Sequence, residues 1–279
     1  MVAVEAGGAP GPAARAHSGE RLTFPSAGRE LIGFRHRPPA RSQADHRPGP
    51  FPAIVVNHGS GLEQDSKPGV ARVLTDAGYL VFVPLRRGYA GSPGPSRLAE
   101  VPAPVGASGH DAQVCARLLA ESDDVLAALR FVRAMPEVDP DRVAVMGSSY
   151  GGINSLLAAA RDGQVRGCVS FAAAAMSWGP VPGLRPFLLQ HADAITCPVL
   201  LVQAENDFDL APSEALAARR RAAGGTCERH LFPPFGASAM EAHQIWVHAP
   251  QIWTPVVLPF LARSVAGRAL EIGQRGNSA

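Results

Sequence analysis

The segment that most constrains the fold of this 279-residue chain is a short run in its middle, Gly147-Ser148-Ser149-Tyr150-Gly151-Gly152. Apolar residues 143–146 before the run predict a buried strand, and residues 153–160 after it predict a helix. A strand that turns directly into a helix strains its middle residue and leaves no room for a Cβ two residues to either side. The pattern is typical of a nucleophile elbow, which presents Ser149 near the positive end of the helix. Ser148 competes with Ser149 but lacks flanking glycines in the same register.

Strands and helices alternate on both sides of this elbow. The strands are expected at residues 21–24, 31–37, 53–56, 79–84, 142–146, 165–172, 199–204 and 230–232. The helices are expected at residues 70–77, 112–135, 149–161, 213–223 and 253–261, with irregular structure between Trp178 and Pro186. Because several strands are apolar on both faces, the chain predicts an α/β fold, with a mainly parallel sheet covered by helices on both sides.

The chain shows no internal repeat, and between its ends the amino-acid composition does not change in a way that would mark a second domain. We therefore expect one domain over residues 19–264. An apolar share of 46% and a charged share of 18% are typical of a globular protein that buries a sizeable core. Both ends are rich in small residues, which predicts flexible tails at residues 1–18 and 265–279.

Charge and cysteine content exclude several classes of protein. With 26 basic and 24 acidic residues the net charge is +2, which predicts no nucleic-acid partner. The four cysteines lie far apart and predict buried thiols, with no disulfide framework and no metal site. Neither a secretory signal nor a membrane-spanning apolar stretch is evident, so a cytoplasmic protein with no membrane partner is expected. No cofactor is implied, and the oligomeric state stays open.

A nucleophilic serine needs an acid that orients its histidine base, and in this fold the chain order is serine, acid, histidine. The apolar strand at residues 198–202 leads into a segment with three carboxylates. Asp207 is the preferred acid, with Asp209 and Glu205 as local rivals, although aspartate is also an ordinary turn residue.

The base must come later in the chain, where His230, His243 and His248 are the candidates. His230 begins a predicted strand, and His248 lies nearer the closing segment. His243 follows a loop of small residues at positions 236–239, where the base of such a triad belongs. His243 is therefore the preferred base.

An oxyanion hole requires two backbone N–H donors. Tyr150, directly after the nucleophile, supplies one, and Ser60 in the turn His58-Gly59-Ser60-Gly61 is the candidate for the other. The same glycines do not form a dinucleotide-binding loop, because Gln64 stands where a third glycine is required.

Taken together, Asn57-His58-Gly59-Ser60, Arg86-Arg87-Gly88-Tyr89, the 147–152 elbow, Asn206-Asp207 and His243 resemble the α/β-hydrolases. The dienelactone-hydrolase-like and prolyl-oligopeptidase-like branches are most similar. The resemblance implies the eight-stranded α/β-hydrolase sheet without a large cap domain, and hydrolysis of an ester or related acyl bond through an acyl-enzyme. Dienelactone hydrolases proper use a cysteine nucleophile where this elbow carries Ser149.

Three aromatic residues, Tyr89, Trp178 and Phe235, are candidate walls of a substrate pocket, since each lies on a loop expected at the carboxyl edge of the sheet. Packing beneath that loop is an equal alternative for each of them. The leading hypothesis is a serine esterase acting on a small-molecule ester or lactone. A peptidase or amidase with the same residues is the alternative, and a non-catalytic binding protein on this scaffold is a third.

Overall fold

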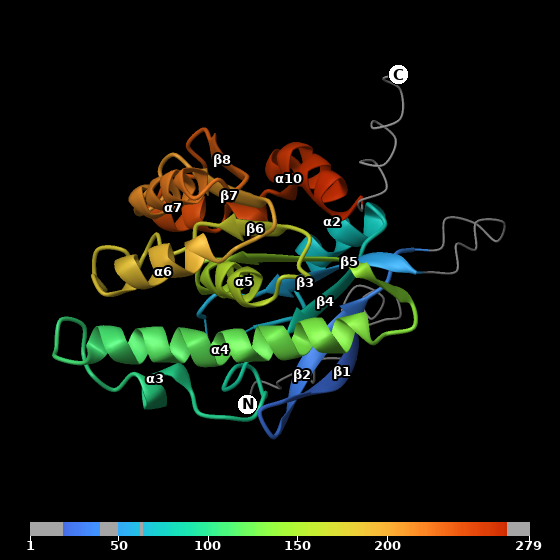
Figure 1. The fold of residues 1–279 in the computed structure, drawn as a ribbon, viewed down its shortest axis with the longest axis horizontal. Coiled ribbons are helices and arrows are strands. Elements are labelled where there is room, and N and C mark those ends of the chain that lie inside the picture. Colours follow the sequence, from blue (N-terminus) through green and yellow to red (C-terminus); the bar gives the residue numbers. More distant parts are fainter. Residues whose placement is uncertain (1–18, 40–49, 62–63, 267–279) are drawn as a thin grey trace, which may run out of the picture.

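The computed structural model describes residues 19–39, 50–61 and 64–266, which form an eight-stranded sheet between two layers of helices (Figure 1). The strands are β1 (Glu20–Ser26), β2 (Arg29–His36), β3 (Phe51–Asn57), β4 (Leu80–Pro84), β5 (Val138–Ser148), β6 (Cys168–Phe171), β7 (Val199–Ala204) and β8 (Cys227–Phe232). The helices are α2 (Pro68–Asp76), α3 (Arg97–Glu100), α4 (His110–Arg133), α5 (Tyr150–Arg161), α6 (Leu184–Asp193), α7 (Ala211–Ala222), α8 (Ala239–His243), α9 (Ile245–His248) and α10 (Pro250–Val265).

The strand order across the sheet is β1-β2-β4-β3-β5-β6-β7-β8. Only the β1–β2 and β2–β4 pairs are antiparallel, and every later neighbour runs parallel. The expected fold class, a mainly parallel sheet with helices on both faces, is confirmed.

Alternating side chains of the central strands separate two apolar cores. On β3, Ala53 and Val55 pack with the layer that contains α4 and α5, whereas Ile54 and Val56 pack with the layer that contains α2 and α10. Figure 1 shows these helices on opposite sides of the sheet. Because strand side chains alternate between faces, a strand covered on both sides is apolar throughout, which explains the unbroken apolar runs in the sequence.

Helix α6 occupies the end of the stretch that we expected to be irregular. Its sequence places Pro186 at the third helical residue, where a missing N–H costs little because the first turn has no acceptor for it. The prolines in the sequence predict irregular structure up to Pro186, and this prediction is wrong from Leu184 onward. Strand β8 also begins earlier than expected, at Cys227.

The expected tails fall mainly on residues that the structure does not describe. At the carboxyl end, however, α10 continues to Val265, whose side chain is buried. Residues 1–18 lie outside the described part of the chain.

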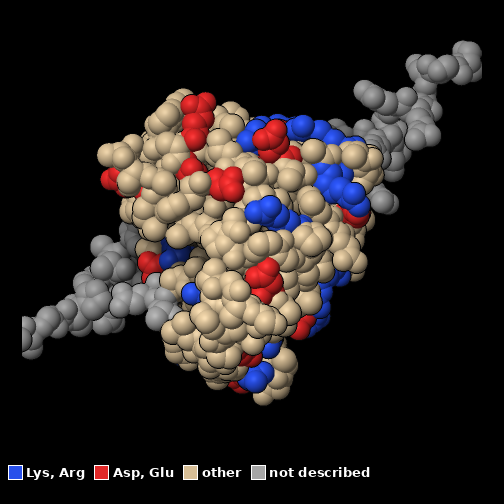
Figure 2. Space-filling model, turned by 90° about the vertical axis from the view of Figure 1, so that its left-hand side faces the viewer, with Lys and Arg blue, Asp and Glu red and all other residues tan. Residues whose placement is uncertain are grey.

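The face of the molecule in Figure 2 carries both acidic and basic side chains on a largely uncharged surface. Exposed ion pairs such as Arg219–Asp193 and Arg263–Glu228 are of this mixed kind. A polyanion is instead bound by a surface of one sign.

Candidate active site

Ser149 stands between β5 and α5 in a conformation that few residues adopt. Its φ is 56° and its ψ is −122°, which lies outside the regular helix and strand regions. A Cβ on Gly147 would lie 2.3 Å from the carbonyl oxygen of Gly151, so the turn closes only with glycine there. Ser149 is partly exposed, whereas Ser148 is buried. The geometry of a nucleophile elbow therefore favours Ser149.

Asp207 and His243 meet at the carboxyl edge of the sheet, beyond β7 and β8. The Nδ1 atom of His243 lies 2.9 Å from Oδ1 of Asp207. The same carboxylate accepts the Phe208 N–H at 2.7 Å and the Gln203 side-chain amide at 3.0 Å. Since the carboxylate only accepts, it selects the tautomer of His243 that carries the proton on Nδ1.

This pairing leaves the second ring nitrogen of His243 available as a base. The Nε2 atom is buried and has no hydrogen-bond partner among the residues that the structure describes, and Ser149 does not supply one. A buried polar atom without a partner is rare and often marks a functional position. The two members of the expected acid–base pair are thus together, and the Nε2 lone pair is free.

The rivals for these two positions have other partners. Asp209 accepts the N–H of Ala211 at 2.8 Å at the start of α7, which is an ordinary role at a helix end. His230 packs against Phe232 with ring centroids 4.4 Å apart, and His248 contacts Gln244. None of these contacts joins a histidine to a carboxylate.

The turn after β3, residues 57–60, packs against the first turn of α5. A Cβ on Gly59 would lie 3.8 Å from the Cβ of Ser149, so the turn is next to the candidate nucleophile. Tyr150 is the first residue of α5, and its N–H has no acceptor within the helix. The N–H groups of Tyr150 and Ser60 therefore belong to two segments that meet beside Ser149.

His58, in this turn, is fully buried and neutral. Burial lowers the pKa of His58 well below its ordinary value, and the adjacent Arg86 charge lowers it further. Its Nε2 accepts the backbone N–H of Arg86 at 3.3 Å, so the ring proton lies on Nδ1, which donates to the carbonyl of Gly59 at 2.8 Å.

The three aromatic residues expected around a pocket differ in their surroundings. Tyr89 is only 1% exposed and lies beneath the turn, with its ring 4.7 Å from that of His58. Trp178 is nearly buried under the guanidinium of Arg185. Phe235 is partly buried, and both its backbone N–H and its carbonyl bond to the side chain of Asn206.

Two exposed apolar side chains beside the Asp207–His243 pair were not expected from the sequence. Phe208 is 44% exposed, and its ring lies 5.6 Å from that of His243, edge to face. Met240 is 43% exposed and lies on α8, three residues before His243. Phe208 directly follows Asp207, and Met240 lies three residues before His243, but an apolar residue carries no such signal in the sequence until the fold exposes it.

Glu121 and Asn154 are further residues near the site that sequence reasoning missed. Both are buried polar side chains, Glu121 on α4 and Asn154 on α5. The available signal was a glutamate between Leu118 and Val125 on the apolar face of the predicted helix.

The cysteines do not offer an alternative nucleophile. All four are free, and burial raises the pKa of Cys168 well above its usual range and that of Cys197 to about 12. Within residues 19–39, 50–61 and 64–266, no group of three or more His, Cys, Asp or Glu side chains is arranged to hold a metal ion. In the same described ranges, no helix combines the length and the apolar character needed to cross a bilayer.

Comparison with known proteins gives a family match and many structural neighbours. The model of the dienelactone hydrolase family matches residues 40–238. The esterase Est1E from Butyrivibrio proteoclasticus, in its structure with ferulic acid, is 17% identical with a TM-score of 0.64, covering 88% of this chain and 100% of that one. An esterase from Pyrococcus furiosus is 15% identical with a TM-score of 0.65, covering 94% of this chain and 97% of that one.

A peptidase from Mycobacterium tuberculosis that hydrolyses puromycin is 20% identical with a TM-score of 0.66. The match covers 90% of this chain but 41% of that one, so this chain spans about two fifths of the peptidase's length. At these identities the structural neighbours establish the α/β-hydrolase fold.

Proposed function

The chain belongs to the dienelactone hydrolase family, and from that premise we propose that it is a serine hydrolase that cleaves a carboxylic ester or lactone through an acyl-enzyme on Ser149. The observation that carries the proposal is the 2.9 Å contact between His243 Nδ1 and Asp207, which leaves Nε2 of His243 without a partner. That arrangement is the base and orienting acid that a serine nucleophile requires.

In the first half of the reaction, Ser149 Oγ attacks the carbonyl carbon of a small-molecule ester while His243 Nε2 takes the hydroxyl proton. Asp207 stabilises the imidazolium that forms, because its carboxylate accepts a hydrogen bond from Nδ1–H throughout. The carbonyl oxygen becomes an oxyanion, which accepts hydrogen bonds from the N–H groups of Tyr150 and Ser60.

Collapse of this intermediate breaks the ester C–O bond, and His243 returns the proton to the departing alkoxide. A water molecule then gives its proton to His243 and attacks the acyl-enzyme carbonyl. Collapse of the second intermediate breaks the bond between Ser149 Oγ and the acyl carbon, His243 returns the proton to Oγ, and the carboxylic acid is released. No cofactor or metal enters any step.

The substrate's apolar part is proposed to lie against the exposed side chains beside the acid–base pair, Phe208 and Met240. Phe235 and Trp178 are proposed walls of the same pocket, while Tyr89 supports the turn beneath it. An apolar surface at the mouth favours an alkyl or aryl ester over a highly charged substrate.

The direct test uses a fluorophosphonate probe, which forms a covalent adduct only with an activated serine. We expect the folded protein to be labelled on Ser149, with labelling lost in Ser149→Ala and retained in Ser148→Ala. Failure to label Ser149 in folded protein, or full activity in Ser149→Ala, would contradict the proposal and favour a binding protein on this scaffold.

A panel of substrates determines which type of bond the protein cleaves. p-Nitrophenyl esters of increasing chain length, lactones and peptide p-nitroanilides are compared on the same preparation, with Ser149→Ala as the blank. We expect esters to be turned over faster than amides. A higher kcat/KM for the anilides would instead assign the chain to the peptidase and amidase class.

A further inference from the structure

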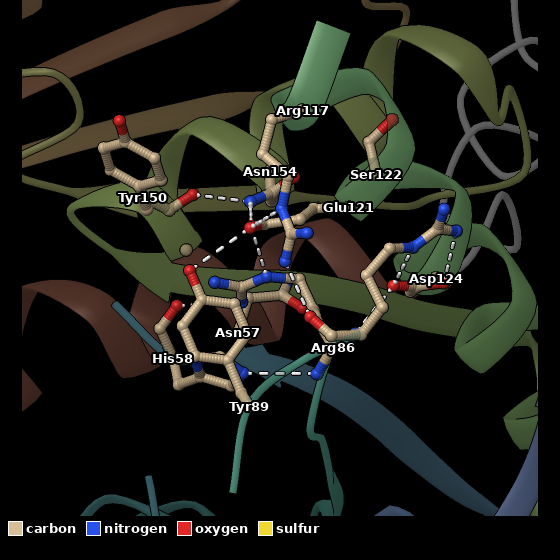
Figure 3. A network of polar contacts seen from close by, with 12 residues as sticks. Asn57, His58, Arg86, Tyr89, Arg117, Glu121, Ser122, Asp124, Tyr150 and Asn154 are labelled. Carbon is tan, nitrogen blue, oxygen red and sulfur yellow. Dashed lines mark hydrogen bonds and ion pairs between the residues drawn. The ribbon is translucent and has the colours of Figure 1, made fainter. Parts of the chain in front are cut away.

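The side chain of Glu121, on α4, is a fully buried carboxylate whose hydrogen bonds come from several different elements of the fold. Its oxygens accept from Arg86 Nε at 2.8 Å, Arg117 Nε at 2.8 Å, Tyr89 Oη at 3.2 Å and Asn154 Nδ2 at 3.0 Å. Figure 3 shows the carboxylate at the centre of these four side chains, which with it are called the Glu121 cluster below. Burial opposes ionisation, but the Arg86 and Arg117 charges outweigh it and lower the pKa of Glu121, so the carboxylate is charged.

On one side the cluster fixes the turn after β3. Arg86, held by Glu121, donates from its two terminal nitrogens to the carbonyl of His58 at 2.8 Å and to that of Gly59 at 3.2 Å. These carbonyls belong to the two residues directly before Ser60. Their orientation therefore sets where the peptide N–H of Ser60 points.

On the other side the cluster fixes the start of α5. Asn154 Nδ2 donates both to Glu121 Oε2 and to the carbonyl of Tyr150, each at 3.0 Å. Tyr150 follows the nucleophile, and Asn154 lies one helical turn later. The side-chain amide of Asn154 therefore connects the Glu121 carboxylate to the first turn of α5.

We infer that Glu121 is a positioning residue for the oxyanion hole, because it holds the Ser60 half through Arg86 and the Tyr150 half through Asn154. This inference rests on the proposed function. Donors that stabilise a developing oxyanion act best when they are fixed before the reaction begins. A buried Arg–Glu pair adds little net stability compared with apolar residues of the same volume, so fixing the geometry is the better explanation for it.

The same loop and helix contain a matched control, the buried pair Arg87–Asp124. Asp124 is 1% exposed and accepts the backbone N–H and Nε of Arg87, both at 2.9 Å, on Oδ2. Its Oδ1 accepts Arg87 Nη2 and the Ser26 hydroxyl, both at 2.7 Å. This pair ties the loop to β1, and none of its hydrogen bonds reaches the 57–60 turn or α5.

The test compares Glu121→Gln with Asp124→Asn. Each carboxylate oxygen accepts two hydrogen bonds, so either amide orientation places an NH₂ group where two donors already point. The two variants therefore lose similar numbers of buried hydrogen bonds. They differ in whether the broken contacts reach the oxyanion hole.

We expect Glu121→Gln to lower kcat for a p-nitrophenyl ester by about 10- to 100-fold with KM changed by less than about threefold, because loss of one complete oxyanion donor costs about 100- to 1,000-fold. Its affinity for an alkyl trifluoromethyl ketone, whose adduct with Ser149 carries an oxyanion, should fall in proportion to kcat/KM. Asp124→Asn should lower the melting temperature by a similar amount yet keep kcat within about threefold of the wild type.

A second variant, Asn154→Ala, removes only the connection to α5. It tests the inference even if Glu121→Gln does not fold. It should also reduce kcat and ketone affinity together. The inference is overturned if either Glu121→Gln or Asn154→Ala keeps wild-type kcat and ketone affinity, or if Asp124→Asn loses as much kcat as Glu121→Gln. If instead the wild type hydrolyses no ester and Ser149 takes up no fluorophosphonate, the proposed function itself fails.

Discussion

Gly151 packs directly on the backbone of Asn57: a Cβ built on Gly151 would lie 2.1 Å from the Asn57 carbonyl oxygen. It would also lie 2.4 Å from the carbonyl of His58. At Gly151 the contact between α5 and the turn after β3 is thus made by main chain on both sides, and no side-chain movement can relieve a clash there.

Replacing Gly151 with alanine should therefore destabilise the protein by at least about 2 kcal/mol, since overpacking against rigid backbone costs more than against a flexible side chain. Gly163→Ala is the control, because nothing lies within 4 Å of its added Cβ. Urea denaturation of both variants measures the difference. Equal midpoints for the two would show that the approach of Gly151 to Asn57 does not constrain the fold.

Asp207→Asn should reduce kcat by about 1,000- to 10,000-fold, because an amide in place of the acceptor no longer fixes the His243 tautomer. Asp209→Asn should leave kcat within a few-fold of the wild type, since the Asp209 carboxylate accepts the N–H of Ala211 at the start of α7. Glu205→Gln should do the same, because Glu205 is exposed. Steady-state hydrolysis of a p-nitrophenyl ester distinguishes the three, and a larger loss in either control would move the acid away from Asp207.

His243→Gln should abolish both ester hydrolysis and fluorophosphonate labelling, because His243 is the proposed base that takes the Ser149 proton. His230→Gln and His248→Gln should retain both, since those side chains contact Phe232 and Gln244 instead. Labelling followed by gel fluorescence gives the answer without knowledge of the substrate. A labelled His243→Gln protein would require a different base.

His58 should make the stability of the protein depend on pH. Its pKa is well below 6.5 in the folded state and returns towards 6.5 on unfolding. Between those values the unfolded chain binds a proton that the folded chain does not, so the free energy of unfolding falls as the pH falls below 6.5. At low enough pH the slope approaches about 1.4 kcal/mol per pH unit.

The measurement is the free energy of unfolding of wild type and His58→Gln from about pH 5 to about pH 8. Burial also lowers the pKa of His36, which contributes to both proteins and cancels in the comparison. The variant should be less stable at neutral pH but show a shallower loss on acidification. Parallel curves would mean that folding does not lower the pKa of His58.

Much of the fold follows from patterns local in sequence. The central strands were predictable because burial on both faces makes residues such as 143–146 uniformly apolar. Helix α6 was not, because a proline in the first turn of a helix and a proline in a loop look alike in the sequence. The strand order, in which β4 lies between β2 and β3, depends on how whole elements pack together. No local sequence pattern predicts it.

In the candidate site, too, some residues could be predicted from the sequence and others could not. Ser149, Asp207 and His243 each follow a strand of their own, so the parallel sheet alone brings their segments to one edge. The contacts of Glu121 with Arg86 and Asn154 join three elements at once. A glutamate in a helical pattern does not reveal which loop will supply its partner.

The position of His243 beyond the last strand has a consequence for synthesis of the protein on the ribosome. The ring is held by the short helices α8 and α9, whose Ala242, Ile245 and Trp246 pack in the same apolar core as Trp253 of α10. The elbow is synthesised first, and its proposed base and α10, which buries the neighbours of that base, are synthesised later. A nascent chain stalled after β8 would thus carry the serine turn without its proposed base, so activity would require synthesis to continue past α10.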